Sequence, residues 1–168
     1  SRMIELQESV VQPHPYQSQW WQWVANLRPI WFLYEPVDGA QRGVLMIGNP
    51  FVMWAGLPAL LACLVWGWLR RDWAMLGVVA LYAASLGVWI VANKPIQFYY
   101  HYLLPGTFLT VAMALILGAW WERRWRWPAA IALAAALGLF AWFYPILSSA
   151  KLPGQQAFLT YTWLFSWR

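Results

Sequence analysis

The stretch Gly43–Leu69, GVLMIGNPFVMWAGLPALLACLVWGWL, decides the fold because it contains no Asp, Glu, Lys or Arg. Three further stretches share this property and run over Trp73–Asn93, Pro95–Trp121 and Trp127–Ala150. A helix of about 20 mostly apolar residues crosses a hydrocarbon core about 30 Å thick. A soluble helical core would need polar faces at helical spacing, and these stretches have none. We therefore predict an all-α integral membrane protein with four spanning helices in antiparallel hairpins, at about 49–69, 73–92, 103–121 and 128–147.

The composition agrees with a membrane protein. Hydrophobic residues make up 62% of the chain and charged residues only 10%, whereas soluble domains carry about 25% charged residues. The chain has 16 tryptophans, most of which flank the ends of the charge-free stretches, where indole rings favour the headgroup level of a bilayer. The formal net charge is +5, but the arginines lie next to apolar spans. Membrane orientation explains them, and nucleic acid is not an expected partner.

The chain divides into three regions. Residues 1–42 form a polar, aromatic lead-in, residues 43–147 carry the four helices, and residues 148–168 form a C-terminal tail. In the lead-in, MIELQESVV (residues 3–11) is predicted as a short strand or the end of a preceding element, and EPVDGAQRG (residues 35–43) as a turn-rich loop. An amphipathic aromatic segment on the membrane surface is predicted from an apolar stripe at near-helical spacing, broken at Pro29. The stripe comprises Trp20, Trp21, Val24, Leu27 and Trp31.

Basic residues predict the orientation. The links RRD (residues 70–72) and ERRWR (residues 122–126) are short and together carry five arginines. Short loops rich in Lys and Arg stay in the cytoplasm. We therefore expect the lead-in, the segment around Lys94 and the C terminus on the outer face of the membrane.

Two polar, aromatic stretches would then share the outer face and form the rim of a site. The first stretch contributes His14, Tyr16, Ser18 and Arg28, and the second contributes Lys94 and His101. Ionisable groups near membrane depth are costly and usually functional. Arginine binds phosphate in a bidentate manner and lysine supplies a compact charge, so an anionic headgroup is the predicted ligand. In the alternative interpretation, the Lys94 side chain simply extends to the interface.

Other kinds of site find less support in the sequence. His14 and His101 have no nearby carboxylates or cysteines with metal-ligand spacing, although a haem or quinone site built on these two histidines stays an alternative. Cys63 is the only cysteine and lies in an apolar stretch, so it is interpreted as a small core residue. No metal ion or other cofactor is expected.

Several motifs in order resemble one protein family. HPYQSQWWQW (residues 14–23), LRPIWFLYE (residues 27–35), IGNPF (residues 47–51) and YHYLLP (residues 100–105) resemble the C-terminal four-helix region of bacterial protein O-mannosyltransferases. The order of the motifs and the four helices also agree with that family. The chain departs from it at Val24-Ala25, where a proline is frequent. It also departs near Lys94 and Gln97, where an arginine is frequent.

This resemblance implies part of a GT-C glycosyltransferase in a bacterial inner membrane. Such enzymes move mannose from polyprenyl-phosphate-mannose to Ser or Thr hydroxyls of an acceptor polypeptide. The family's catalytic base lies in an Asp-Glu motif near the N terminus, and no such motif is present here. We therefore expect the chain, which begins without a methionine, to work with the N-terminal half of the same enzyme and with membrane lipids, and to be inactive alone. No residue of this chain is assigned as catalytic.

Two alternatives to mannosyl transfer stay open. One is a related lipid-phosphate-sugar transferase with another sugar or acceptor, such as lipid A or a glycan. The other is a non-catalytic membrane subunit that binds lipid or a partner protein.

Overall fold

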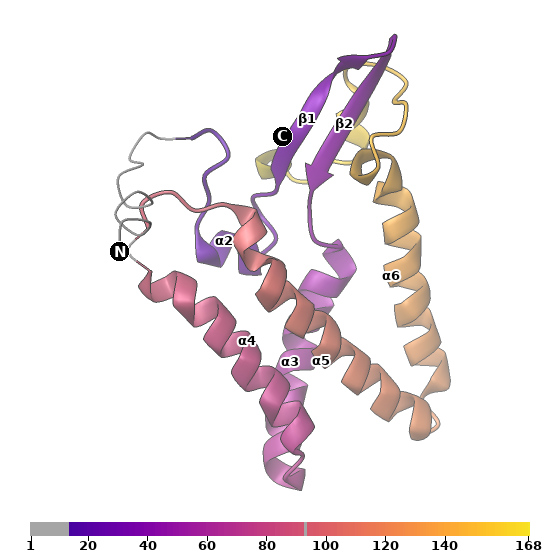
Figure 1. Ribbon diagram of the computed structural model, residues 1–168. Coiled ribbons are helices and arrows are strands. Elements are labelled where there is room, and N and C mark those ends of the chain that lie inside the picture. Colours follow the sequence, from indigo (N-terminus) through magenta and orange to yellow (C-terminus); the bar gives the residue numbers. More distant parts are fainter. Residues whose placement is uncertain (1–13, 93) are drawn as a thin grey trace.

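Four long helices form the body of the protein, and they confirm the four predicted membrane spans. The computed structural model describes residues 14–92 and 94–168, so the expectation for residues 3–11 lies outside the described residues. The helices are α3 (Pro50–Arg70), α4 (Trp73–Val91), α5 (Leu103–Glu122) and α6 (Arg126–Leu147), and successive helices run in opposite directions (Figure 1). All four are long and apolar enough to cross a membrane.

Polar side chains mark where α3 and α4 begin. The Asn49 side chain accepts hydrogen bonds from the backbone N–H groups of Phe51 (3.1 Å) and Val52 (3.3 Å), and Pro50 occupies the first turn as expected. Asp72 caps α4 in the same way. Because Asp72 immediately follows Arg71, which adopts a left-handed conformation (φ 57°), α3 ends and α4 starts within two residues.

Helices α3, α4 and α5 pack closely, whereas α6 stands apart from them along most of its length (Figure 1). A Cβ at Gly56 of α3 would lie 3.1 Å from the Leu109 side chain of α5, so this glycine permits the close approach. Cys63 is buried in the same packing layer, as expected for a core residue. Asn49 Nδ2 donates to the Ala136 carbonyl of α6 (2.8 Å). Only 11% of the apolar window of α4, and of α6, is buried, so both helices present wide apolar surfaces.

The prediction of a loop at residues 35–43 is wrong, because these residues form the turn and part of both strands of a β-hairpin. Strand β1 (Ile30–Val37) pairs antiparallel with β2 (Ala40–Met46), and a two-residue turn joins them. Asp38 and Gly39 both have positive φ (51° and 71°), as the twist of a tight hairpin requires. A two-stranded hairpin therefore adds to the predicted all-helical architecture.

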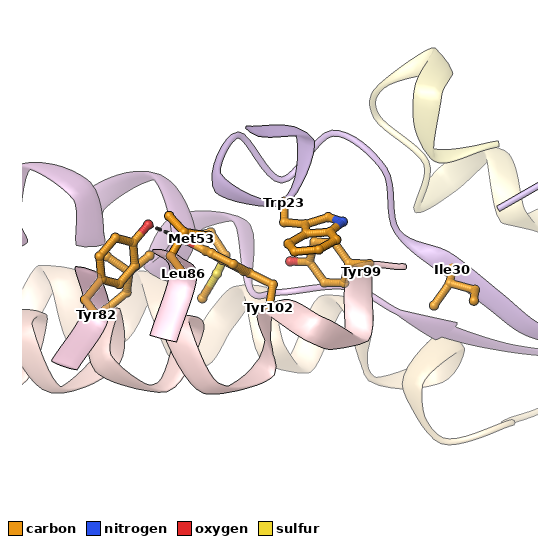
Figure 2. Close-up of a cluster of buried hydrophobic side chains, with 8 residues drawn as sticks. Trp23, Ile30, Met53, Tyr82, Leu86, Tyr99 and Tyr102 are labelled. Carbon is orange, nitrogen blue, oxygen red and sulfur yellow. Dashed lines mark hydrogen bonds between the residues drawn. The ribbon is translucent and has the colours of Figure 1, made fainter. Parts of the chain in front are cut away.

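The predicted amphipathic helix in the lead-in is also shorter than its apolar stripe. Helix α2 covers only Trp20–Val24, and Trp31 lies in β1 instead. The Trp23 side chain is 0% exposed, so this ring belongs to the core and not to the membrane surface. Figure 2 shows it in a buried cluster with Tyr99 and Tyr102, which come from the 3-10 turn Tyr99–Tyr102 ahead of α5.

The C-terminal tail packs against the hairpin. The Leu152 N–H donates to the Gln41 carbonyl (2.9 Å), and the Tyr34 hydroxyl donates to the Gln155 carbonyl (2.6 Å). Two short 3-10 turns, Ala157–Thr160 and Phe165–Trp167, complete the tail. The hairpin, α2 and the C terminus thus gather at one end of the helices, opposite the α3–α4 and α5–α6 links (Figure 1).

One buried amide, Asn26, joins these parts. Its Nδ2 donates to the Gly48 carbonyl (3.1 Å), and its Oδ1 accepts from the Tyr99 hydroxyl (2.6 Å), which itself accepts from the Gly48 N–H (3.0 Å). Its backbone carbonyl accepts from Trp167 Nε1 (2.7 Å). The lead-in, the start of α3, the segment before α5 and the tail therefore all meet at a fully buried Asn26 with φ 56°.

We expect Asn26→Gly to lower the free energy of unfolding by about 2–3 kcal/mol, because two buried hydrogen bonds are lost and the Tyr99 hydroxyl loses its acceptor. Glycine keeps the left-handed conformation, so backbone strain does not enter. Asp38→Gly, at an exposed position of similar φ, is the matched control and should change stability by about 0.5 kcal/mol or less. Thermal unfolding of the full-length protein in detergent measures both, and equal midpoints for the two variants would contradict the role given to Asn26.

Candidate functional site

A cavity of about 670 Å³ opens between the lead-in and the C-terminal end of α4. His14, Ser18 and Arg28 line one side, and Trp89 and Lys94 line the other. The backbone holds the two sides together, because the Ser18 N–H donates to the Gln97 carbonyl (2.8 Å). The structure therefore brings the two polar stretches singled out in the sequence into one place.

On the lead-in side, backbone contacts position the polar groups. The Arg28 guanidinium donates from Nη2 to the Pro15 carbonyl (2.8 Å), which ties the segment after α2 to the segment before it. His14 Nδ1 accepts from the Tyr16 N–H (3.2 Å), so a neutral His14 ring carries its hydrogen on Nε2. The edge of this ring contacts Phe98 at 5.1 Å between centroids.

Lys94 and His101 form a pair on the opposite side. Lys94 Nζ lies 3.3 Å from His101 Nε2, and His101 Nδ1 lies 2.8 Å from the Phe98 carbonyl. Nδ1 also lies 3.1 Å from the Phe98 backbone nitrogen, so it faces both polar groups of Phe98. When Nδ1 carries the hydrogen, it donates to the Phe98 carbonyl while Nε2 accepts from Lys94. The imidazole contacts the rings of Trp23 and Trp89, with centroids 5.7 and 3.9 Å away.

This arrangement fixes the direction of the Lys94 side chain. Its Nζ also lies 6.0 Å from the Trp89 ring centroid, within range of a cation–π interaction. Lys94 lines the cavity, whereas His101 does not and instead contacts two residues that do, Lys94 and Trp89. Because both ring nitrogens of His101 have partners within the chain, this residue has no nitrogen left for a haem iron.

Two of the six candidate residues serve the local structure. Ser18 is buried, and its hydroxyl accepts from Trp23 Nε1 (2.8 Å), so the hydroxyl holds α2 in place. Tyr16 packs against the buried cluster around Trp23 and does not line the cavity. His14, Arg28 and Lys94 are the candidates that remain free to meet a ligand at the cavity surface.

Trp89 and Asn26 contribute to this site but were not singled out from the sequence. Trp89 supports both Lys94 and His101. Its signal is weak, because a tryptophan at the end of an apolar stretch is equally typical of a membrane interface. Asn26 positions the site from outside the cavity, and a single asparagine in a polar lead-in carries no local pattern.

Comparison with known proteins identifies the family. Residues 1–167 match the family described as the C-terminal four TMM region of protein-O-mannosyltransferase. The chain belongs to this family. The match covers the lead-in, the hairpin, all four helices and the tail, so the resemblance stated from the sequence motifs is confirmed.

Curated relatives of this family are longer proteins. The polyprenol-phosphate-mannose--protein mannosyltransferase of Mycolicibacterium smegmatis is 30% identical over 177 residues, which cover 92% of this chain and 33% of the relative. The protein of the same name from Mycobacterium tuberculosis is 29% identical over 174 residues, with the same coverage. The chain thus spans about a third of the length of the curated relatives it matches.

A solved structure shares the fold. The Saccharomyces cerevisiae protein O-mannosyltransferase Pmt1-Pmt2 complex bound to the sugar donor matches 98% of this chain with a TM-score of 0.70. The sequence identity is 20%, and the chain covers 25% of that chain. At this identity the match shows the fold alone: the chain folds like the corresponding quarter of that protein.

For this family member we expect Ser18→Ala to lower the free energy of unfolding by about 1–3 kcal/mol, because the Trp23 indole N–H would be buried without an acceptor. Ser148→Ala is the matched control, since the Ser148 hydroxyl is exposed and bonds only to the Tyr144 carbonyl one turn before it. We expect it to change stability by about 0.5 kcal/mol or less. Thermal unfolding of the full-length enzyme in detergent distinguishes the two, and an unchanged midpoint for Ser18→Ala would show that the hydroxyl has no structural role.

Proposed function

We propose that this chain is the C-terminal membrane portion of an enzyme that moves mannose from polyprenyl-phosphate-mannose to Ser or Thr hydroxyls of a polypeptide. The match of residues 1–167 to the protein O-mannosyltransferase region carries the proposal. The names of the mycobacterial relatives support the donor and the protein acceptor. The donor, the acceptor polypeptide, the surrounding lipids and the rest of the same enzyme are the proposed partners.

The cavity beside α2 is the proposed place for the lipid phosphate. Its two cationic side chains, Arg28 and Lys94, come from opposite sides, and none of the described residues that line it is acidic. A phosphate between them would gain charge-assisted hydrogen bonds from both. His14 Nε2–H offers a further donor at the rim.

The proposed reaction is a displacement at the anomeric carbon of mannose. The acceptor oxygen forms the new bond as the bond to the phosphate oxygen breaks, and the hydroxyl proton passes to a carboxylate base supplied by the rest of the enzyme. The departing phosphate gains negative charge as that bond breaks. Arg28 and Lys94 would stabilise this charge where it develops, which lowers the barrier.

We expect Arg28→Ala and Lys94→Ala each to lower kcat/KM for mannose transfer by roughly 10- to 100-fold, the size of a lost hydrogen bond to a charged group. Lys151→Ala is the control for charge, because Lys151 is exposed on the C-terminal tail. The assay follows transfer from polyprenyl-phosphate-mannose to a Ser/Thr peptide by the full-length enzyme. Equal rates for all three variants would contradict the proposal that Arg28 and Lys94 bind the phosphate. Transfer from the corresponding glucose lipid, but not from the mannose lipid, would instead identify a related transferase.

His101 is a positioning residue in this proposal, since it acts through Lys94. We therefore expect His101→Ala to lower transfer less than Lys94→Ala does. The double variant should be no slower than Lys94→Ala alone, because coupled residues are not additive. Additive losses would show that His101 acts independently of Lys94.

We also propose that the lead-in, the hairpin and the C terminus face the outside of the plasma membrane. The five arginines in the two short links support this orientation. In a full-length enzyme without other reactive cysteines, Gln156→Cys on the tail should react with a membrane-impermeant thiol reagent in whole cells. Trp125→Cys in the α5–α6 link should react only after the membrane is opened. The reverse pattern would overturn the orientation.

A further inference from the structure

The α3–α4 link and the α5–α6 link form a second charged surface, far from the cavity. They lie at the opposite end of the helices from α2 and the hairpin (Figure 1). Residues 70–72 and 122–126 together contain five arginines and two acidic residues. The preference of Lys- and Arg-rich short loops for the cytoplasm explains why the arginines lie on one side of a membrane. It does not explain how their side chains are arranged there.

Two of these arginines, from different links, converge on one indole ring. The guanidinium carbon of Arg70 lies 6.0 Å from the Trp66 ring centroid, and that of Arg123 lies 5.7 Å from the same centroid. Trp66 is partly buried and packs against the core layer of α3 and α5 around Cys63. The ring is therefore held in place, and one guanidinium from the α3–α4 link and one from the α5–α6 link lie against it.

The carboxylate of Asp72, in the α3–α4 link, already has hydrogen-bond partners. Asp72 Oδ1 accepts from the backbone N–H groups of Ala74 (3.0 Å) and Met75 (3.2 Å), where it caps α4. Two guanidinium groups that share one ring repel each other, and an anion bound by both of them would offset that repulsion. A phosphate suits this place, because arginine donates two parallel hydrogen bonds to phosphate oxygens.

The surroundings favour a lipid over a soluble anion. Three tryptophans flank the same two links and are among the most exposed large side chains of the protein, at 75%, 77% and 80% exposure: Trp68, Trp73 and Trp127. Such rings stabilise a protein at the headgroup level of a bilayer. A free phosphate ion would gain nothing from them, whereas the acyl chains of a phospholipid would cover them.

We propose that Arg70 and Arg123, held over Trp66, bind the phosphodiester of an anionic phospholipid headgroup, with its acyl chains against the exposed apolar flank of the neighbouring helices. The bound lipid would join the α3–α4 hairpin to the α5–α6 hairpin at the end of the protein opposite the cavity. This site is separate from the proposed donor site and does not depend on the transfer reaction.

The test counts bound lipids on the full-length enzyme in a neutral detergent by native mass spectrometry during titration with phosphatidylglycerol. The double variant Arg70→Gln/Arg123→Gln should weaken the tightest binding step by roughly tenfold or more, since each basic residue near an anionic headgroup contributes about a fivefold factor. The matched control Arg71→Gln/Arg124→Gln removes the same charge from the same links but leaves the pair over Trp66, and it should weaken that step clearly less than Arg70→Gln/Arg123→Gln does. Mannose transfer in detergent, unchanged in both double variants, shows that they are folded.

Three results would overturn the proposal. The first is an equal loss of phosphatidylglycerol binding in the two double variants, which would show that only the net charge matters. The second is that the zwitterionic phosphatidylcholine binds as tightly as phosphatidylglycerol in the same first step. The third is displacement of phosphatidylglycerol by millimolar inorganic phosphate, which would make this a site for a free anion.

Discussion

The hydrogen bonds of Asn26 are the constraint on which the cavity end of the protein depends. A buried asparagine side chain must satisfy both its donor and its acceptor, because an unpaired polar group costs more than a formed hydrogen bond gains. The side chain of Asn26 meets this requirement with Gly48 and Tyr99, and its backbone carbonyl accepts from Trp167. These three groups come together only in the observed arrangement. Apolar packing alone would tolerate small shifts between α2, the start of α3 and the tail. The amide does not, and it therefore fixes the lead-in relative to Lys94 and His101.

The membrane helices could be predicted because their signal is local. The length of a run without charges can be read directly from the sequence, and the chain contains four runs that are long enough to span a bilayer. The hairpin differs from the predicted loop although Asp38-Gly39 is a strong signal for a tight turn, because turn-forming residues dominate residues 35–43 and conceal the strands on either side. The stripe from Trp20 to Trp31 was misinterpreted for a related reason. Strand residues such as Trp31 happened to continue a helical spacing that ends at Val24.

The candidate site was only partly visible in the sequence. His14, Arg28 and Lys94 were found because charged and polar groups are rare in such a chain and lie near the ends of apolar runs. The sequence alone does not show which of the candidate residues can meet a ligand and which hold the local structure. Ser18 and Tyr16 share a motif with His14, yet the fold uses the Ser18 hydroxyl to hold the Trp23 indole and packs Tyr16 against the buried cluster. Long-range contacts of this kind, such as that of Lys94 with His101 against Trp89, depend on side-chain directions that a linear pattern does not contain.

The bond from Trp167 to the Asn26 carbonyl joins residues 141 positions apart, across all four helices. Contacts this distant in sequence form late, because the whole intervening chain must first be in place. During synthesis, α3 to α6 must therefore cross the membrane before the lead-in acquires its last partner, and until then the buried carbonyl of Asn26 lacks its indole donor. The cavity end of the enzyme is thus completed only after residue 167 has been made. A change at Trp167 that removes its indole N–H would therefore disturb a segment more than a hundred residues earlier in the chain.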